Sequence, residues 1–214
     1  MPKITSIKQQ KRLTDRFSLY VDGKFDLGVD GSLIVKYDLH VGTELTPKLR
    51  SNLENADRTE LAYMGLLNFI SFRERCEFEV HEWLFKKGFL DLEDDLVSRL
   101  KSKNYLNDER FTKLFVRDRI NLKGWGPTRL RHELARKRID RSIIENMLDD
   151  INEEYDFLEI ANTLIQKKLR FIERPTYKDK KRIFNLLQRR GFTANLISQA
   201  LESTIFYRED DSLD

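Results

Sequence analysis

Hydrophobic residues recur every three or four positions from Pro47 almost to the end of this chain, which is the spacing of amphipathic helices. Before Pro47, hydrophobic and polar residues alternate instead, as they do in half-buried strands. The pattern therefore predicts a mainly α-helical protein that is preceded by a small β-rich segment over residues 1–46.

Two alternating runs in the β-rich segment flank Asp22-Gly23 and predict a β-hairpin. A two-residue loop at this dipeptide would place Leu19 opposite Asp26, so that the apolar faces of the strands would disagree. A three-residue loop with Gly23 in the left-handed conformation pairs Leu19 with Phe25 instead. We therefore expect the three-residue loop.

The rest of the β-rich segment is expected to hold a third strand containing Ile4 and Ile7, and a short helix over Ser32–Leu39 closed by Gly42. An isolated hairpin is only marginally stable in water. We therefore expect this segment to pack against the helical part of the chain or against a partner.

One helix ending occurs three times in the helical part, and its final apolar residues lie 50 and 53 positions apart. Such a period indicates an internal repeat. A repeated helical unit buries its apolar face by stacking on its neighbours, so we expect tandem three-helix repeats in an elongated, gently curved array. The three copies are Leu84–Phe89 (Leu-Phe-Lys-Lys-Gly-Phe), Leu134–Ile139 (Leu-Ala-Arg-Lys-Arg-Ile) and Leu187–Phe192 (Leu-Gln-Arg-Arg-Gly-Phe).

The repeat period and the change at Pro47 predict the domain boundaries. We expect a small β-rich N-terminal extension over residues 1–46, helical repeats over residues 47–106, 107–153 and 154–206, and an acidic tail over residues 207–214.

Helix start and stop signals support these boundaries. We predict N-caps at Asp57 and Asp108, before first helices that run from about Glu60 and Glu109, and Pro127 suits the first turn of a second helix. Gly88 and Gly191 are predicted to adopt the left-handed conformation that ends a helix. Arg138 stands at the equivalent position of the middle copy, so that ending should be less comfortable or formed differently.

Basic residues concentrate on the second helix of the later repeats, although 39 basic and 36 acidic residues give a net charge of only +3. Residues 117–141 and residues 170–190 each carry a net charge of +6, whereas acidic residues gather at 91–95 and in the tail. A step of 100° per residue places Arg129 and Arg136 of one second helix, and Arg182 and Arg189 of the other, opposite the apolar face. The first copy has Glu79 and Lys86 at the equivalent positions.

Stacked repeats should merge the matched basic positions into one stripe, the footprint expected for a polyanionic partner. The alternative is a solvated face whose arginines pair with nearby carboxylates. Trp125 and Tyr177 are candidate platforms for single-stranded nucleic acid, although core or loop packing is the more common role of such rings. The candidate binding residues are Arg129, Arg136, Arg182 and Arg189, with Lys86, Arg131, Lys181 and Arg190 as supporting charge.

Signatures of catalysis are absent from the sequence. Three histidines and one cysteine provide no zinc motif and no nucleophile motif, and no glycine-rich phosphate loop is present, so we expect no enzyme, cofactor or metal. Cys76 is interpreted as a half-buried, unreactive thiol. Without an apolar run long enough for a signal peptide or membrane span, we expect a soluble, cytoplasmic monomer.

Three blocks of residues resemble the RecX family of bacterial regulatory proteins, and the resemblance covers residues 60–204, while the predicted hairpin is similar to the extension of some longer members. It implies a non-enzymatic protein that binds the RecA recombinase filament in its helical groove, contacts single-stranded or duplex DNA, and restrains strand exchange and coprotease activity in DNA repair and recombination. The blocks are Tyr105–Phe111 (Tyr-Leu-Asn-Asp-Glu-Arg-Phe), Lys123–Leu134 (Lys-Gly-Trp-Gly-Pro-Thr-Arg-Leu-Arg-His-Glu-Leu) and Lys180–Phe192 (Lys-Lys-Arg-Ile-Phe-Asn-Leu-Leu-Gln-Arg-Arg-Gly-Phe).

Two alternatives to a filament regulator remain. Three short helices per repeat can also present a helix-turn-helix with its basic helix in the major groove, as in a DNA-binding regulator. The third interpretation is a scaffold that binds only protein.

Overall fold

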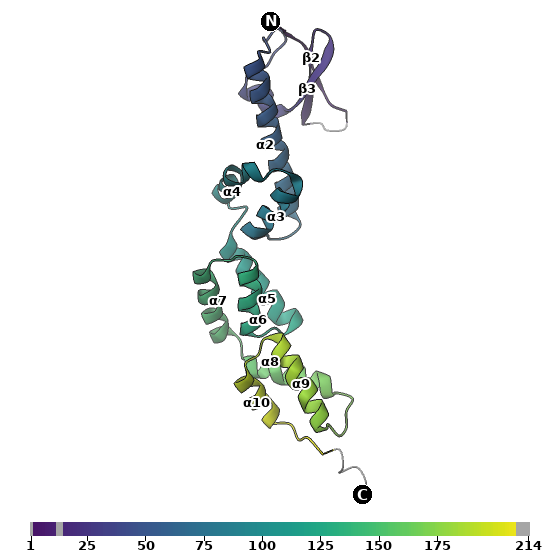
Figure 1. The fold of residues 1–214 in the computed structure, drawn as a ribbon, viewed down its shortest axis with the longest axis vertical. Helices are drawn as coiled ribbons and strands as arrows, with labels where there is room; N and C mark the ends of the chain where they lie inside the picture. The colour runs from purple at the N-terminus through teal and green to yellow at the C-terminus, as the bar shows by residue number, and fades with distance from the viewer. Residues whose placement is uncertain (1, 12–14, 209–214) are drawn as a thin grey trace. The chain divides into compact units, whose positions relative to one another are not determined.

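The computed structural model describes residues 2–11 and 15–208. The chain divides into two compact units: an N-terminal unit with residues 1–74 and 80–105, and a C-terminal unit with residues 75–79 and 106–214. The mainly helical prediction, with a small β-rich segment at the N-terminus, is confirmed (Figure 1). The acidic residues of the predicted tail, from Glu209 onward, lie outside the described residues.

The sheet of the N-terminal unit contains three antiparallel strands in the order β1 (Ile4–Gln9), β2 (Arg16–Val21) and β3 (Lys24–Asp30). The third strand is therefore confirmed, but the predicted three-residue loop is wrong. Val21 pairs with Lys24, and Asp22 and Gly23 both have positive φ (50° and 77°), as a two-residue type I′ turn requires.

A β-bulge explains how a two-residue loop keeps the apolar faces in agreement. Tyr20 pairs with Phe25 and Leu19 pairs with Leu27, so Asp26 is an extra residue in β3. The extra residue restores the alternation, and Leu19 is fully buried.

Two helices complete the core of the sheet: α1 (Gly31–Lys36) and the first half of α2 (Pro47–Ser71), which contributes Leu53. The segment thus packs against the helical part of the chain, as expected. The predicted closure of α1 by Gly42 is wrong, because Asp38 has the positive φ (48°) and Leu39 N–H donates to the Ile34 carbonyl. Gly42 lies further along, where its N–H donates to the Ile4 carbonyl.

The first helix of the first repeat begins well before the predicted residue, at Pro47, where the Thr46 side chain accepts a hydrogen bond from Leu49 N–H. Asp57 therefore lies inside α2, and its prediction as an N-cap is wrong. Its carboxylate accepts two hydrogen bonds from the Arg16 guanidinium, at 3.1 and 2.8 Å, and one from Asp30 N–H at 2.8 Å. Asp57 fastens the sheet to the helix.

The N-terminal unit ends with α3 (Glu77–Lys87), a 3-10 turn η1 (Leu90–Leu92) and α4 (Glu93–Ser102). The first turn of α3 falls in residues 75–79 and so in the C-terminal unit. Arg58 of α2 donates to the Asp91 carboxylate and to the Gly88 carbonyl, and its hydrogen bond lowers the pKa of Asp91. Asp91 of the acidic cluster is therefore used in a contact at the end of α3, and no group of metal-binding side chains occurs among the described residues.

The C-terminal unit contains two three-helix repeats built on one continuous core. The first buries Val116, Leu130 and Ile144, and the second adds Ile165 and Ile183 to the same cluster. The helices are α5 (Asp108–Lys123), α6 (Pro127–Arg136), α7 (Arg141–Glu154), α8 (Phe157–Leu169), α9 (Tyr177–Arg190) and α10 (Ala194–Glu202).

The start of α6 at Pro127 is confirmed, whereas the N-cap of α5 is Asn107 rather than Asp108. The Asn107 side chain accepts from Arg110 N–H, and the Asp108 carboxylate instead accepts from Glu77 N–H at 2.9 Å. Throughout the described part of the chain, no helix is both long enough and apolar enough to cross a membrane.

Candidate functional site

The second helices α3, α6 and α9 carry the predicted basic residues, and all three end in the same way. Gly88, Arg138 and Gly191 follow them with φ of 74°, 56° and 89°. Arg138 thus forms the same left-handed ending as the glycines, at a cost of about 1–2 kcal/mol for its Cβ. Its guanidinium lies 4.6 Å from the centre of the Phe78 ring.

Helix α9 ends against the first turn of α6, at a contact that we call the glycine joint and that contains residues 123–129 and 189–192. Gly126 N–H donates to the Arg190 carbonyl at 2.7 Å, and Thr128 N–H donates to the Gly191 carbonyl at 3.2 Å. These bonds satisfy N–H groups at the start of α6 and carbonyls at the end of α9 that lack partners within their own helices. The two helix dipoles meet head to tail, which is the favourable arrangement.

Glycine is required on both sides of this joint because the two backbones touch. A Cβ on Gly126 would lie 2.6 Å from the Gly191 carbonyl oxygen, and a Cβ on Gly191 would lie 2.3 Å from the Arg129 nitrogen. Trp125 packs edge-on against Phe115, with ring centres 6.2 Å apart, as part of the shared core. The Gly-Trp-Gly-Pro motif therefore has a structural role in joining the repeats.

Helix α6 in turn ends against residues 75–79, at a contact that we call the arginine joint. The Cys76 thiol donates to the Lys137 carbonyl at 4.0 Å, and Lys137 Nζ forms an ion pair with Glu79 at 2.7 Å. Cys76 is fully buried rather than half-buried, and burial raises the pKa of its thiol to about 11. The thiol is therefore neutral and unreactive near pH 7, as expected.

The predicted binding residues occupy two kinds of position. Arg129 and Arg190 are half-buried at the glycine joint, where Arg129 Nη1 donates to the Arg189 carbonyl at 3.0 Å and Arg190 donates to the Lys123 carbonyl. The expectation that Arg129 is exposed is wrong, because its guanidinium also covers the Trp125 ring at 4.1 Å. The other six side chains are exposed: Lys86, Arg131, Arg136, Lys181, Arg182 and Arg189.

Four arginines follow one another across the glycine joint, and we call Arg136, Arg129, Arg189 and Arg182 the arginine stripe. Arg129 and Arg136 lie two turns apart on one side of α6, and Arg182 and Arg189 do so on α9. The hydrogen bond from Arg129 to the Arg189 carbonyl connects the two pairs. The two pairs of arginines are thus linked through the Arg189 backbone at the glycine joint.

The exposed arginines of the stripe remain available to a partner. Arg136 pairs with Glu133, and Arg182 with Asp179, both at 3.4 Å, while the arginine side chains are 71% and 73% exposed. Such exposed pairs contribute little free energy. Hydrogen bonds from Thr176, more than the charge of Arg182, lower the pKa of Asp179, so its carboxylate serves mainly to cap α9.

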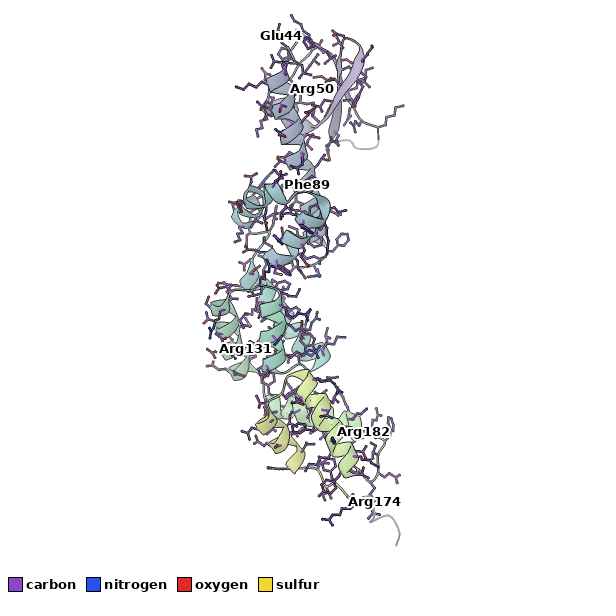
Figure 2. The ribbon with its side chains drawn as sticks, in the orientation of Figure 1. Glu44, Arg50, Phe89, Arg131, Arg174 and Arg182 are labelled. Carbon is purple, nitrogen blue, oxygen red and sulfur yellow. The ribbon has the colours of Figure 1, made fainter. Side chains whose placement is uncertain are left out.

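The supporting residues do not all belong to this stripe. Arg131 forms an ion pair with Glu145 of α7 at 2.7 Å, and Figure 2 shows Arg131 and Arg182 toward opposite edges of the C-terminal unit. Lys86 is exposed on α3 in the N-terminal unit, and Lys181 lines a groove between α9 and α10. Sequence reasoning missed this groove, although the spacing of Tyr177, Lys181 and Phe184 places them on one helix face.

Three segments of the chain match known domain families. Residues 2–46 match the N-terminal domain of regulatory protein RecX, residues 107–148 match the second three-helix domain of RecX, and residues 154–201 match the third.

The chain is similar over nearly its whole length to proteins named regulatory protein RecX. It is 33% identical to the one from Bacillus velezensis and 31% identical to the one from Bacillus subtilis, in each case over 99% of this chain and 81% of the relative. A crystal structure of regulatory protein RecX superimposes with a TM-score of 0.76 at 26% identity, covering 95% of this chain and all of that one.

Proposed function

The chain belongs to the RecX family of regulatory proteins, and from that premise we propose that it binds the RecA recombinase filament, probes its groove with the arginine stripe, and contacts DNA there. Binding would restrain strand exchange and coprotease activity, with no bond made or broken. A protein that binds one state of a filament more tightly than another shifts the population toward that state.

The observation that carries this proposal is the stripe itself. A filament of recombinase on single-stranded DNA presents a long polyanionic groove, and a cationic row along two successive helices complements it. Backbone hydrogen bonds at the glycine joint hold α6 and α9 in a fixed relation, so the backbone positions from which their arginines project are set before binding. Less conformational entropy is lost when the groups are pre-organised.

The test is charge reversal of the exposed stripe residues together, Arg136→Glu, Arg182→Glu and Arg189→Glu, with Arg129 kept because it supports the joint. Capture of purified RecA, with and without single-stranded DNA and ATP, and inhibition of strand exchange should both fall at least roughly tenfold at low salt, and the difference from the unsubstituted protein should narrow as salt is added. Helical circular dichroism should not change.

The matched control reverses three exposed cations of the same unit that lie on α5 and α7: Lys113→Glu, Arg117→Glu and Arg141→Glu. It alters net charge equally and should retain RecA capture. If both triple variants lose RecA capture equally, the loss follows from net charge alone, and the role of the stripe as the binding surface is refuted.

The helix-turn-helix alternative is less well supported by the geometry. A recognition helix inserts its N-terminal residues into the major groove, whereas the end of α9 covers the first turn of α6. We therefore expect affinities for different duplex sequences to differ far less than the roughly thousandfold that base-edge recognition provides.

A further inference from the structure

Residues of α9 and α10 line an open groove of about 630 Å³ in the last repeat. Its volume falls in the range of small-molecule sites, roughly 300–1,000 Å³. Phe184 and the buried Leu201 provide an apolar floor, and Lys180 and Lys181 lie on the α9 side. The groove therefore combines apolar surface with positive charge.

Tyr177 lines this groove and is 55% exposed, so much of its ring is accessible to a ligand. Lys180 Nζ lies 5.9 Å from the centre of its ring and 5.5 Å from that of Phe206. An exposed ring with cations beside it is the arrangement by which proteins stack bases of single-stranded nucleic acid.

The backbone around Tyr177 is held from two directions. Thr176 and Asp179 form a capping box at the start of α9, and the Thr176 N–H and hydroxyl both donate to the Asp179 carboxylate, each at 3.0 Å. The segment after α10 returns to this point, where Tyr207 N–H donates to the Pro175 carbonyl at 2.9 Å and Tyr177 N–H donates to the Tyr207 carbonyl. The ring is thus presented from a fixed position.

We propose that this groove binds one unstacked nucleotide of a single-stranded nucleic acid, with the base on Tyr177 above the apolar floor and the phosphates beside Lys180 and Lys181. Glu202 also lines the groove, and its carboxylate would repel a bare phosphate while it can accept a hydrogen bond from a base N–H group, such as N3–H of thymine. The ligand that fits is therefore a nucleotide and not a simple anion.

The groove and the arginine stripe occupy adjacent faces of α9. Lys181 and Arg182 are consecutive residues of α9, so their side chains point about 100° apart around the helix. The inference rests on the proposed contact with DNA and names the site of that contact, but it does not require the contact with RecA.

The test is a fluorescence anisotropy titration of a labelled oligothymidylate at fixed salt with the full chain. Tyr177→Ala should weaken binding about tenfold, because one stacked base is lost, and Tyr177→Phe should bind as the unsubstituted protein does. Tyr105→Ala provides the matched control, since Tyr105 is 48% exposed in the N-terminal unit, and it should have no effect.

Three results would overturn the proposal: unchanged binding by Tyr177→Ala, equal loss in Tyr177→Phe, or equal loss in Tyr105→Ala. A fourth result would also overturn it: Tyr177→Ala weakens the capture of RecA without DNA but leaves oligothymidylate binding unchanged. The groove would then be a site for protein and not for nucleic acid.

Combining Tyr177→Ala with the triple stripe variant separates the two proposals. If the groove is an independent site, the substitution lowers oligothymidylate affinity by the same factor in both backgrounds. If the unsubstituted protein does not capture RecA, the proposed filament function is refuted, but Tyr177→Ala should still lower oligothymidylate affinity. If Tyr177→Ala does not lower that affinity, the groove is refuted as the binding site.

Discussion

At the glycine joint α9 ends against the first turn of α6, and at the arginine joint α6 ends against residues 75–79. Both helices finish with a left-handed residue, Gly191 or Arg138. At the glycine joint the backbones touch, and a Cβ on Gly191 would lie 2.3 Å from the Arg129 nitrogen. The arginine joint is closed by side chains, including the Lys137–Glu79 pair at 2.7 Å.

The difference shows that close backbone approach, and not the left-handed turn alone, makes glycine necessary. Arg138 adopts φ of 56° with a full side chain, which then lies over Phe78. The cost of its conformation is only about 1–2 kcal/mol, a size that neighbouring contacts can offset.

The same difference limits the basic surface. Glu79 stands where the glycine joint has Arg129, and it pairs with Lys137, whose side chain is only 24% exposed. The arginine stripe therefore does not continue past the arginine joint, and it is confined to α6 and α9.

The largest effect should come from adding one methyl group to the glycine joint. Gly191→Ala places a Cβ against the Arg129 backbone, and neither chain can move without breaking the hydrogen bonds of the joint. Left-handed strain and overpacking together should cost about 2–5 kcal/mol. Urea unfolding followed by far-ultraviolet circular dichroism measures the loss.

Gly88→Ala is the matched control for this substitution. Gly88 ends α3 with φ of 74°, but a Cβ there would meet no atom within 4 Å. Only the left-handed strain remains, about 1–2 kcal/mol. If Gly191→Ala and Gly88→Ala lose equal stability, close backbone approach is not what makes glycine necessary at the glycine joint.

A smaller effect should appear at high pH in the arginine joint. The Cys76 thiol has an ordinary pKa of 9.0, and burial raises it to about 11 in the folded protein. Between these values the unfolded chain has lost a proton that the folded chain retains, so the free energy of unfolding falls as pH rises, by about 3 kcal/mol in total.

Cys76→Ala removes this titration, and the difference in stability between the two proteins should narrow from pH 9 to pH 11. Tyrosines and lysines titrate in both proteins and cancel in the difference. A parallel pH dependence of the two proteins would show that the thiol does not titrate with a raised pKa.

Most helices could be predicted because their signals are local. The apolar period, Pro127 at the start of α6, and Gly88 and Gly191 after α3 and α9 all act within a few residues. Asp57 could not be placed, because a cap signal was overridden by Arg16, 41 residues earlier in the chain. The loop length of the hairpin was predicted wrongly for another reason: a bulge at Asp26 shifts the strand register by one residue, which is the shift that a longer loop would also give.

The candidate site was predictable to the same degree. A helical projection placed Arg136, Arg182 and Arg189 on the solvent side, and the structure confirms their exposure. It placed Arg129 there too, because no local signal announces the end of α9, 60 residues later, that covers it. The groove beside Tyr177 likewise depends on α10 and on the returning Tyr207 segment.

The smallest effect should come from giving the arginine joint the residue that the other endings have. Arg138→Gly removes left-handed strain of about 1–2 kcal/mol, but it loses the contact with Phe78, about 0.5–1 kcal/mol, and gives the unfolded chain about 0.5–1 kcal/mol of extra entropy. These contributions nearly cancel, so the urea midpoint should shift by the equivalent of less than about 0.5 kcal/mol. A large gain in stability would show that the strain at Arg138 is uncompensated. A large loss of stability would show that the Arg138 side chain stabilises the arginine joint, as backbone contact stabilises the glycine joint.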